Sequence, residues 1–174
     1  MNIRESKSED LNSIRLVNKD AFGEPEGEVV AQLACDILAD ESAKPLLSVV
    51  ADDDGKIIGS IIFSSVKIEG NEELSAYILA PLAISKNYQQ QGLGTTLINH
   101  GLEALKKRGV DIVLVLGDPS YYTRTGFIAG HSIEPPYILE YPEAWMAIEL
   151  KPGTLDIAKG VVQCATSLMV PEYW

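Results

Sequence analysis

Two glycines stand two positions apart at the start of a segment that otherwise has the features of a long helix. They are Gly92 and Gly94, in the stretch 87–109 (NYQQQGLGTTLINHGLEALKKRG). Glycine in regular structure costs roughly 0.5 to 1 kcal/mol relative to alanine, so its use here favours close approach of another group to the backbone. The first turn of a helix also has unpartnered N–H groups and the positive end of the helix dipole. The pair therefore predicts an anion site, with phosphate as the expected ligand.

The surrounding residues exclude one common phosphate motif and disfavour another. A P-loop needs a lysine directly after the glycine, whereas Thr95 and Thr96 follow Gly94 and the next lysine is Lys106. A dinucleotide fingerprint would need glycine where Leu97 stands, and it belongs to a βαβ unit that the preceding segment does not form. Two glycines alone would equally fit an ordinary turn into a helix.

The rest of the segment has the pattern of a helix anchored along one face. Lys106, Lys107 and Arg108 complement the negative end of the dipole, and Gly109 is a left-handed stop. One apolar face is expected to be buried while the N-terminus stays free to meet a ligand. The apolar face consists of Leu93, Leu97, Ile98, Leu102 and Leu105.

Periodicity predicts the elements that must hold this helix in place. A short strand at 2–4 precedes a first helix, for which Ser6 and Glu9 fit a capping box. Next come a second helix and three strand-like runs forming an antiparallel meander, the first two joined by the acidic turn 52–55. A buried strand, a short helical segment and a last strand follow the glycine-led helix. The expected ranges are helices at 11–21 and 29–38, strands at 46–51, 56–68 and 74–85, then 111–117, 118–127 and 145–150.

Length and charge limit the class of protein. With 174 residues, 46% of them hydrophobic, we expect a single domain over 1–174, with a core at about 3–150 and an extension at 151–174 that packs on it. Only 14 Lys and Arg stand against 25 Asp and Glu, a formal net charge of -11, which argues against a nucleic-acid partner. A cationic or neutral substrate suits such a surface better.

The start of the chain has no signal-peptide pattern, and no run of 18 apolar residues follows it. We therefore expect no membrane association and a cytoplasmic location. Cys35 and Cys164 are far apart and are expected to be reduced, apolar side chains. His100 and His131 form no ligand spacing with them, so no metal site is predicted.

The glycine-led loop resembles a motif of the GNAT superfamily of N-acetyltransferases. The spacing Gln89-x-x-Gly92-x-Gly94 is similar to the Q/R-x-x-G-x-G/A loop that binds a pyrophosphate in that superfamily. The preceding PLAIS, at 81–85, resembles its splayed fourth strand. Pro81 is consistent with a disturbed strand, because proline withholds a ladder donor.

A second motif of the superfamily follows the first, in the same order along the chain as in that superfamily. Tyr122, with Gly126 and Phe127, is similar to the Y-x-x-x-G-F element of the same superfamily. The string GDPSYYTRTGF and the phrase at 149–155 (ELKPGTL) resemble the YhbS-like branch of small bacterial GNAT proteins. Asp118 stands where the superfamily usually has an asparagine-bearing turn, and it is expected to cap the short helix after it.

The resemblance implies an α/β fold of the α+β kind. It has a single mixed, mostly antiparallel sheet, splayed in the middle, with helices on both faces. It also implies acetyl-CoA as co-substrate, with its pantetheine arm paired to strand backbone and its pyrophosphate held by loop N–H groups. An N–H near Leu82 or Ala83 would donate to the thioester oxygen. The implied cofactor-binding residues are Leu82, Ala83, Ile84, Gln89, Gln90, Gln91, Gly92, Leu93, Gly94 and Thr95.

By the same resemblance, Tyr122 is the catalytic residue that protonates the departing thiolate. A phenol with an ordinary pKa near 10 is protonated at neutral pH and can donate. Tyr121 is the alternative acid, and Arg124 could meet the phosphates. The strand that often carries a glutamate acting as base has none here, so water is the alternative base. The candidates by chemistry alone are Tyr77, Glu73, Glu134, Glu140 and Glu143.

Two functions remain from the sequence. The first is an acetyl-CoA-dependent N-acetyltransferase in which a small amine or peptide amine attacks the thioester directly. The second is a CoA-binding regulatory or structural module without turnover, which the missing strand carboxylate favours. The sequence indicates neither the acceptor amine nor whether the protein is a monomer or a homodimer. The aromatic pair Tyr173 and Trp174 is compatible with contacts or with a tucked-in chain end.

Overall fold

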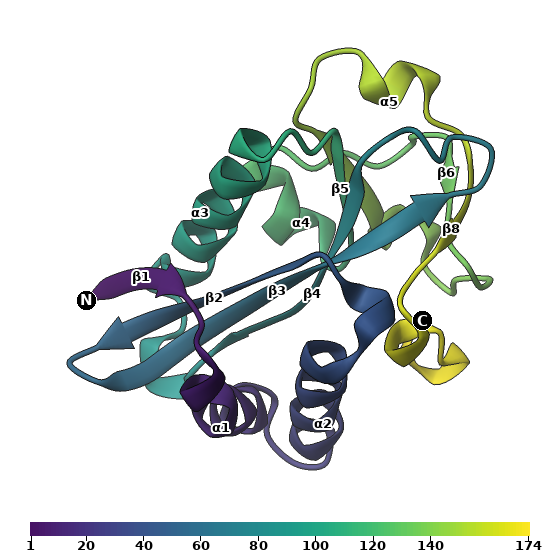
Figure 1. Cartoon of the computed structure of the whole chain (residues 1–174). Coiled ribbons are helices and arrows are strands. Elements are labelled where there is room, and N and C mark those ends of the chain that lie inside the picture. The colour runs from purple at the N-terminus through teal and green to yellow at the C-terminus, as the bar shows by residue number, and fades with distance from the viewer.

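The computed structural model describes residues 1–174 and contains one eight-stranded mixed sheet between two layers of helices (Figure 1). Six strands lie in the order β1-β2-β3-β4-β5-β7, and β8 joins β3 to β6 beside them. The strands are β1 (Asn2–Glu5), β2 (Leu46–Asp53), β3 (Lys56–Ile68), β4 (Ala76–Ile84), β5 (Ile112–Leu116), β6 (Ile133–Glu134), β7 (Trp145–Glu149) and β8 (Gly160–Gln163).

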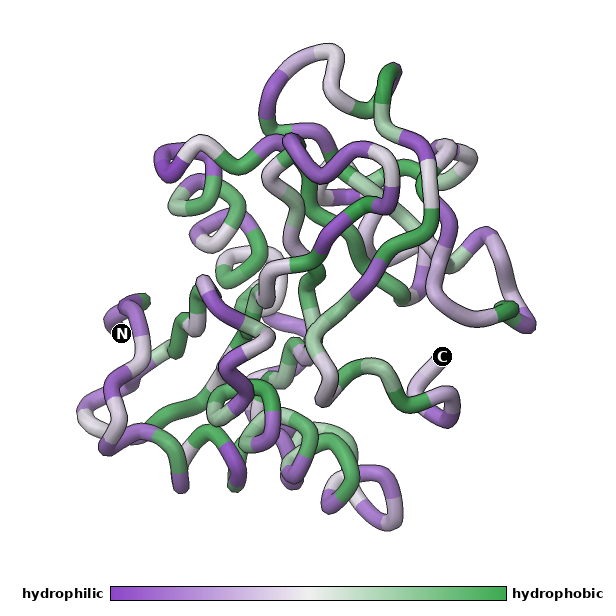
Figure 2. Tube along the Cα trace, turned by 45° about the vertical axis from the view of Figure 1, so that its right-hand side comes forward, coloured by the Kyte–Doolittle hydropathy of each residue, from purple (hydrophilic) through white to green (hydrophobic).

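The helices cover both faces of the sheet, as expected. Side chains of the first two helices join one apolar cluster, and those of the third join another on the opposite face. Figure 2 shows apolar segments along the strands and polar ones on the outer turns. None of the helices has the length and apolar character that crossing a membrane requires. The helices are α1 (Leu11–Phe22), α2 (Glu26–Ala39), α3 (Leu93–Lys107), α4 (Pro119–Tyr122) and α5 (Thr154–Ile157).

The predicted meander of three strands is confirmed. Strands β2, β3 and β4 are consecutive antiparallel neighbours, and β2 and β3 are joined by the acidic turn. In that turn the Asp52 carboxylate accepts the N–H of Gly55 at 2.7 Å. Asp54 and Gly55 both have positive φ, as expected for a two-residue hairpin turn.

The sheet splits between β4 and β5. These strands run parallel but share only three residue pairs, from Ala76 opposite Ile112 to Ile78 opposite Leu114. Beyond Ile78, β4 stays paired with β3, with a register shift opposite Ala80 and Pro81, whereas β5 continues with β7. Because the bulge bends β4, the two strands part from this point.

Helix α3 lies close to the sheet because a glycine faces a phenyl ring. A Cβ placed on Gly101 would lie 2.2 Å from Cε2 of Phe63 in β3. Phe63 is fully buried, and the apolar face predicted for this helix is buried around it. This contact fixes the helix axis, and therefore the position of its N-terminus at the split. The left-handed stop at Gly109 is also as predicted, with φ of 83°.

Three features differ from expectation. The capping box is formed by the Lys7 N–H and the Asp10 carboxylate at 2.7 Å, not by Ser6 and Glu9, because a single 3₁₀ turn precedes α1. Strands β6 and β8 were not predicted, since each is four residues or shorter and half exposed. Cys164 is buried as expected, but Cys35 is only partly buried, and both are free thiols.

We expect Gly101→Ala to destabilise the fold. The added methyl group cannot be accommodated without moving the ring of Phe63, and overpacking of this kind costs about 1 to 3 kcal/mol. Urea unfolding would measure the loss, with His100→Ala on the exposed side of the same helix as control. Equal stability of the two variants would contradict the proposed contact.

Candidate active site

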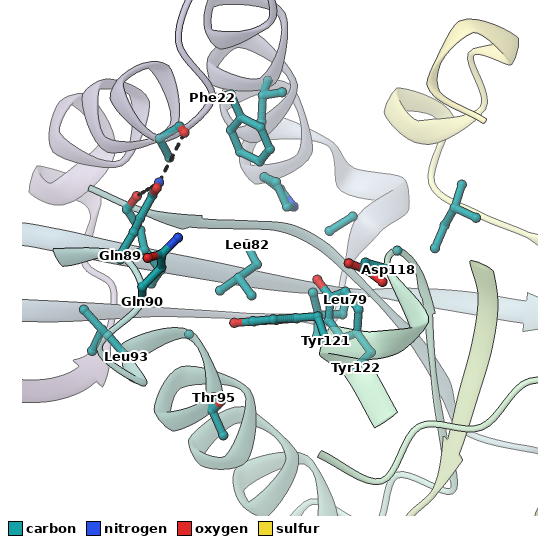
Figure 3. Close-up of a pocket in the computed structure, with 18 of the residues that line it drawn as sticks. Phe22, Leu79, Leu82, Gln89, Gln90, Leu93, Thr95, Asp118, Tyr121 and Tyr122 are labelled. Atoms are coloured by element: carbon teal, nitrogen blue, oxygen red, sulfur yellow. Dashed lines mark hydrogen bonds between the residues drawn. The ribbon is translucent and has the colours of Figure 1, made fainter. Parts of the chain in front are cut away.

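A cavity of about 930 Å³ occupies the gap between β4 and β5 (Figure 3). Its floor is β4, one side is the N-terminus of α3 with the loop before it, and the other side is α4. The C-terminal end of α1, the N-terminal half of α2 and Tyr173 close it. Of the predicted site residues, those that line it are Leu82, Ile84, Gln89, Gln90, Gly92, Leu93, Gly94, Thr95 and Tyr122.

The α3 end of the cavity presents a concave set of backbone donors. The N–H groups of residues 90–95 donate to no acceptor in the protein, and the first intrahelical bond runs from the Thr96 N–H to the Gly92 carbonyl at 3.1 Å. Gln90 and Gly92 have φ of 60° and 83°, which turns successive N–H groups toward one side. Together with the helix dipole, this geometry suits a phosphate.

The glutamines of the loop have structural contacts. The Gln89 side-chain amide donates to the carbonyls of Ile84 at 2.9 Å and Ala21 at 3.3 Å, tying the loop to β4 and α1 (Figure 3). The Gln91 amide donates to the Asn87 carbonyl, and Gln91 lies outside the cavity lining.

The unpaired edge of β4 offers backbone groups to the cavity. The Ser85 N–H donates to the Ile58 carbonyl of β3, and antiparallel strands alternate in the direction of their hydrogen bonds. Ala83, opposite Ser60, therefore turns its backbone groups toward β3, while Leu82 and Ile84 turn theirs toward the gap. Ala83 is buried and does not line the cavity, so the geometry does not suit it for the pairing expected of it.

Two adjacent tyrosines from α4 project into the cavity (Figure 3). The rings of Tyr121 and Tyr122 meet edge to face at 5.0 Å, and Tyr122 stacks in the same way on buried Phe127 at 5.7 Å. Gly117, at the end of β5, leaves room for Tyr122, since a Cβ there would lie 2.3 Å from Cε2 of the ring. Gly126 has φ of 98°, which allows the turn that brings Phe127 under the tyrosine.

The structure explains the glycine at position 94 differently from the sequence, which suggested close approach of an anion to the backbone. A Cβ on this residue would lie 1.9 Å from the hydroxyl oxygen of Tyr121. The glycine therefore makes room for an aromatic side chain, while Gly92 has open space around it and is needed for its positive φ. The Tyr121 hydroxyl consequently sits at the mouth of α3, beside the backbone donors.

Only two of the cavity-lining side chains carry charge. Arg124 follows α4, and Asp118 precedes it. Burial raises the pKa of Tyr121, and the positive charge of Arg124 opposes that rise. Burial also raises the pKa of Tyr122, strongly, with the neighbouring Tyr121 adding to the effect. Both phenols are therefore held in the protonated form at neutral pH.

The candidates for a base lie elsewhere. Tyr77 is buried in the core under α3, and none of the four glutamates considered from the sequence lines the cavity. The cavity also contains residues that the sequence did not single out as functional. They include Phe22, Val30, Leu33, Gly117 and Tyr173, which come from four separate segments and share no local pattern.

The geometry defines a class of protein that holds a long, anionic ligand. An open strand edge leads from a phosphate-suited helix N-terminus to a protonated phenol. The family model described as "Acetyltransferase (GNAT) family" matches residues 11–127. The chain also shares 39% identity over 165 residues with an uncharacterized N-acetyltransferase, YjhQ, of Escherichia coli K12, across 90% of this chain and 87% of YjhQ. The chain therefore belongs to the GNAT acetyltransferase family.

Solved structures agree with this assignment and with the expected fold. The crystal structure of YhbS from Escherichia coli in complex with CoA aligns with a TM-score of 0.87 and 30% identity, over 96% of this chain and 91% of that one. A GNAT family acetyltransferase from Brucella melitensis in complex with acetyl-CoA aligns with a TM-score of 0.78 and 28% identity, over 96% of this chain and 97% of that one. The predicted splayed sheet and the resemblance to YhbS are confirmed.

We expect Gly94→Ala to weaken CoA binding by about tenfold, equivalent to about 1.4 kcal/mol, because its methyl group displaces the Tyr121 ring at the mouth of α3. Tyr121→Phe removes the clashing oxygen and leaves the ring carbon at 3.3 Å. The double variant should therefore recover most of the affinity. Calorimetry with CoA measures both, with exposed Asn99→Ala on the same helix as control. The same loss in both backgrounds would refute this coupling.

Proposed function

We propose that the protein is an acetyl-CoA-dependent N-acetyltransferase in which a substrate amine attacks the acetyl group directly. The observation that carries this proposal is the continuity of one cavity from the α3 N–H groups, along the open edge of β4, to Tyr122. Holding both reactants in one cleft removes the entropy cost of their encounter, about 7 to 11 kcal/mol in well-oriented systems.

The residues of the cavity fit the co-substrate at each point. The N–H groups of 90–95 would hold the pyrophosphate, and Arg124 is the one cation of the lining available to it. The free backbone groups of Leu82 and the N–H of Ile84, whose carbonyl already accepts a hydrogen bond from Gln89, would pair with the pantetheine arm in the manner of an added strand. The Leu82 N–H, rather than that of Ala83, would then face the thioester oxygen, a contact worth about 3 kcal/mol in the transition state.

Proton transfer falls to Tyr122. When bound, acetyl-CoA supplies an acetyl thioester, whose carbonyl carbon forms a bond to the amine nitrogen as the C–S bond breaks and the sulfur leaves as a thiolate. The buried phenol of Tyr122 donates a proton to that sulfur. No carboxylate of β4 is available to deprotonate the amine, so its proton passes to water at the open side of the cavity.

The second candidate function is a CoA-binding module without turnover, which the missing carboxylate on β4 favours. Free thiol release from acetyl-CoA with a panel of amines separates the two. Release above the amine-free rate with at least one amine is expected from the enzyme. Tight CoA binding without release for any amine would instead support the module.

We expect Tyr122→Phe to lower kcat by about 10²-fold, the lower end of the range for a general acid, with CoA affinity unchanged. Thiol release and calorimetry measure the two quantities. Tyr141→Phe, an exposed tyrosine outside the cavity, is the control. Unchanged turnover would remove the acid role of Tyr122.

The pH profile of the wild type should reflect the same phenol. Because burial raises the pKa of Tyr122, the acid form persists above the ordinary value near 10 and is lost only as pH rises beyond it. Between pH 7 and 10 the rate should therefore rise, as the amine loses its proton. A fall of kcat below pH 9 that is absent from Tyr122→Phe would place the phenol's pKa too low for this account.

A further inference from the structure

We infer that the acceptor is a small monocationic primary amine with an apolar body, its ammonium held by Asp118 and its apolar part by a wall to which the C-terminal segment contributes Tyr173. This inference rests on the proposed acetyl transfer and adds to it the chemical class of the second substrate. It follows from the half of the cavity that the co-substrate would leave free.

The cavity has two chemically different ends. Around α3 it is lined by backbone donors, glutamines and Arg124, which suit phosphate. On the far side of Leu82 the lining is apolar, from α2, the β4 bulge, the end of β5 and the last residues of the chain. The side chains of this apolar wall are Val30, Leu33, Pro81, Leu116 and Tyr173.

Asp118 lies at this second end, beside the two tyrosines and across the cavity from Gln90 and Leu93 (Figure 3). It is the one carboxylate among the lining residues. Its Oδ1 caps α4 by accepting the N–H and hydroxyl of Ser120, at 2.9 and 2.8 Å. Its Oδ2 receives no hydrogen bond from the protein. The geometry therefore leaves one anionic oxygen for a ligand next to the proposed acid.

The C-terminal segment that contributes Tyr173 to the apolar wall is held in place by two sets of contacts. The Asp40 carboxylate, after α2, accepts the N–H and hydroxyl of Ser167 at 2.9 and 2.7 Å. Trp174 packs edge to face on Trp145 at 5.5 Å, and its indole N–H donates to the Leu168 carbonyl at 2.8 Å. Tyr173 therefore stands on an ordered segment tied to the domain core.

The single carboxylate decides between classes of amine. A polyamine or an aminoglycoside carries several charges, and each would need an anionic partner in the cleft to offset its loss of hydration. The chain has 25 acidic residues, yet only Asp118 lines the cavity. A charged head beside Asp118 followed by an aryl or branched alkyl group matches the lining.

Two assays on the full chain test the inference separately from the proposed function. Calorimetry with CoA comes first, because absence of binding would overturn the acetyltransferase proposal itself. Thiol release from acetyl-CoA is then compared for phenethylamine, isoamylamine, ethanolamine, spermidine and a peptide with a free N-terminus. We expect kcat/KM for the two apolar amines to exceed the others by at least tenfold. Equal or reversed preference, with CoA bound, would overturn the acceptor class alone.

Variants then assign the two contacts. Asp118→Asn keeps the helix cap, since asparagine caps as well as aspartate, but removes the charge. It should raise KM for phenethylamine at least tenfold while CoA affinity and Tm stay unchanged. Asp156→Asn, at an exposed helix start outside the cavity, is the matched control. A KM within twofold of the wild type would exclude Asp118 as the ammonium contact.

Tyr173→Ala should lower kcat/KM for phenethylamine about tenfold and leave that for ethanolamine nearly unchanged, whereas Tyr173→Phe should retain the preference. Tyr141→Ala, outside the cavity, is the control for loss of an aromatic ring. A loss shared equally by both amines, or no loss, would exclude the C-terminal segment from the apolar wall.

Discussion

The parting of β4 and β5 is the constraint on which the site depends. After three shared residue pairs the strands separate, because the bulge at Ala80 and Pro81 bends β4, whose far end stays paired with β3. The edge of β4 then presents backbone groups, within the molecule, that no other strand satisfies. Backbone groups in such a position require partners. A ligand with amide groups along its length meets that requirement, and the cavity runs along the open edge of β4, where such a ligand would lie.

Glycines position the catalytic side of the gap by leaving space for aromatic rings. Gly101 admits Phe63, Gly94 admits the Tyr121 hydroxyl, and Gly117 admits Tyr122. Each contact brings backbone from one element against a ring from another, so that α3, β5 and α4 are held relative to one another. The aromatic contacts of Tyr122 with Tyr121 and Phe127 then exclude water from its ring. The raised pKa of the phenol follows from the same packing.

Few charged side chains line the site, although the chain is strongly acidic. With a net charge of -11, the surface would repel a coenzyme that carries several phosphates. The cavity reduces this repulsion by offering backbone N–H groups, a helix dipole and Arg124 at one end, and by keeping its carboxylate, Asp118, at the other. This separation of donors from the carboxylate gives the cleft a direction, with the anionic ligand on one side and the cationic one on the other.

Local signals in the sequence were sufficient for helices α1 to α4, for all strands except β6 and β8, and for the two motifs, since periodicity and the Gly92 and Tyr122 motifs depend on neighbours along the chain. They predicted the meander, the buried strand, the left-handed stop after α3 and the family resemblance. Only the tertiary structure decided three other features. It showed that Gly94 makes room for Tyr121, that Ala83 turns its backbone groups toward β3, and that Asp118 and Tyr173 line the same cavity. Each depends on strand register or on packing between residues distant in sequence, and a local sequence pattern determines neither of these.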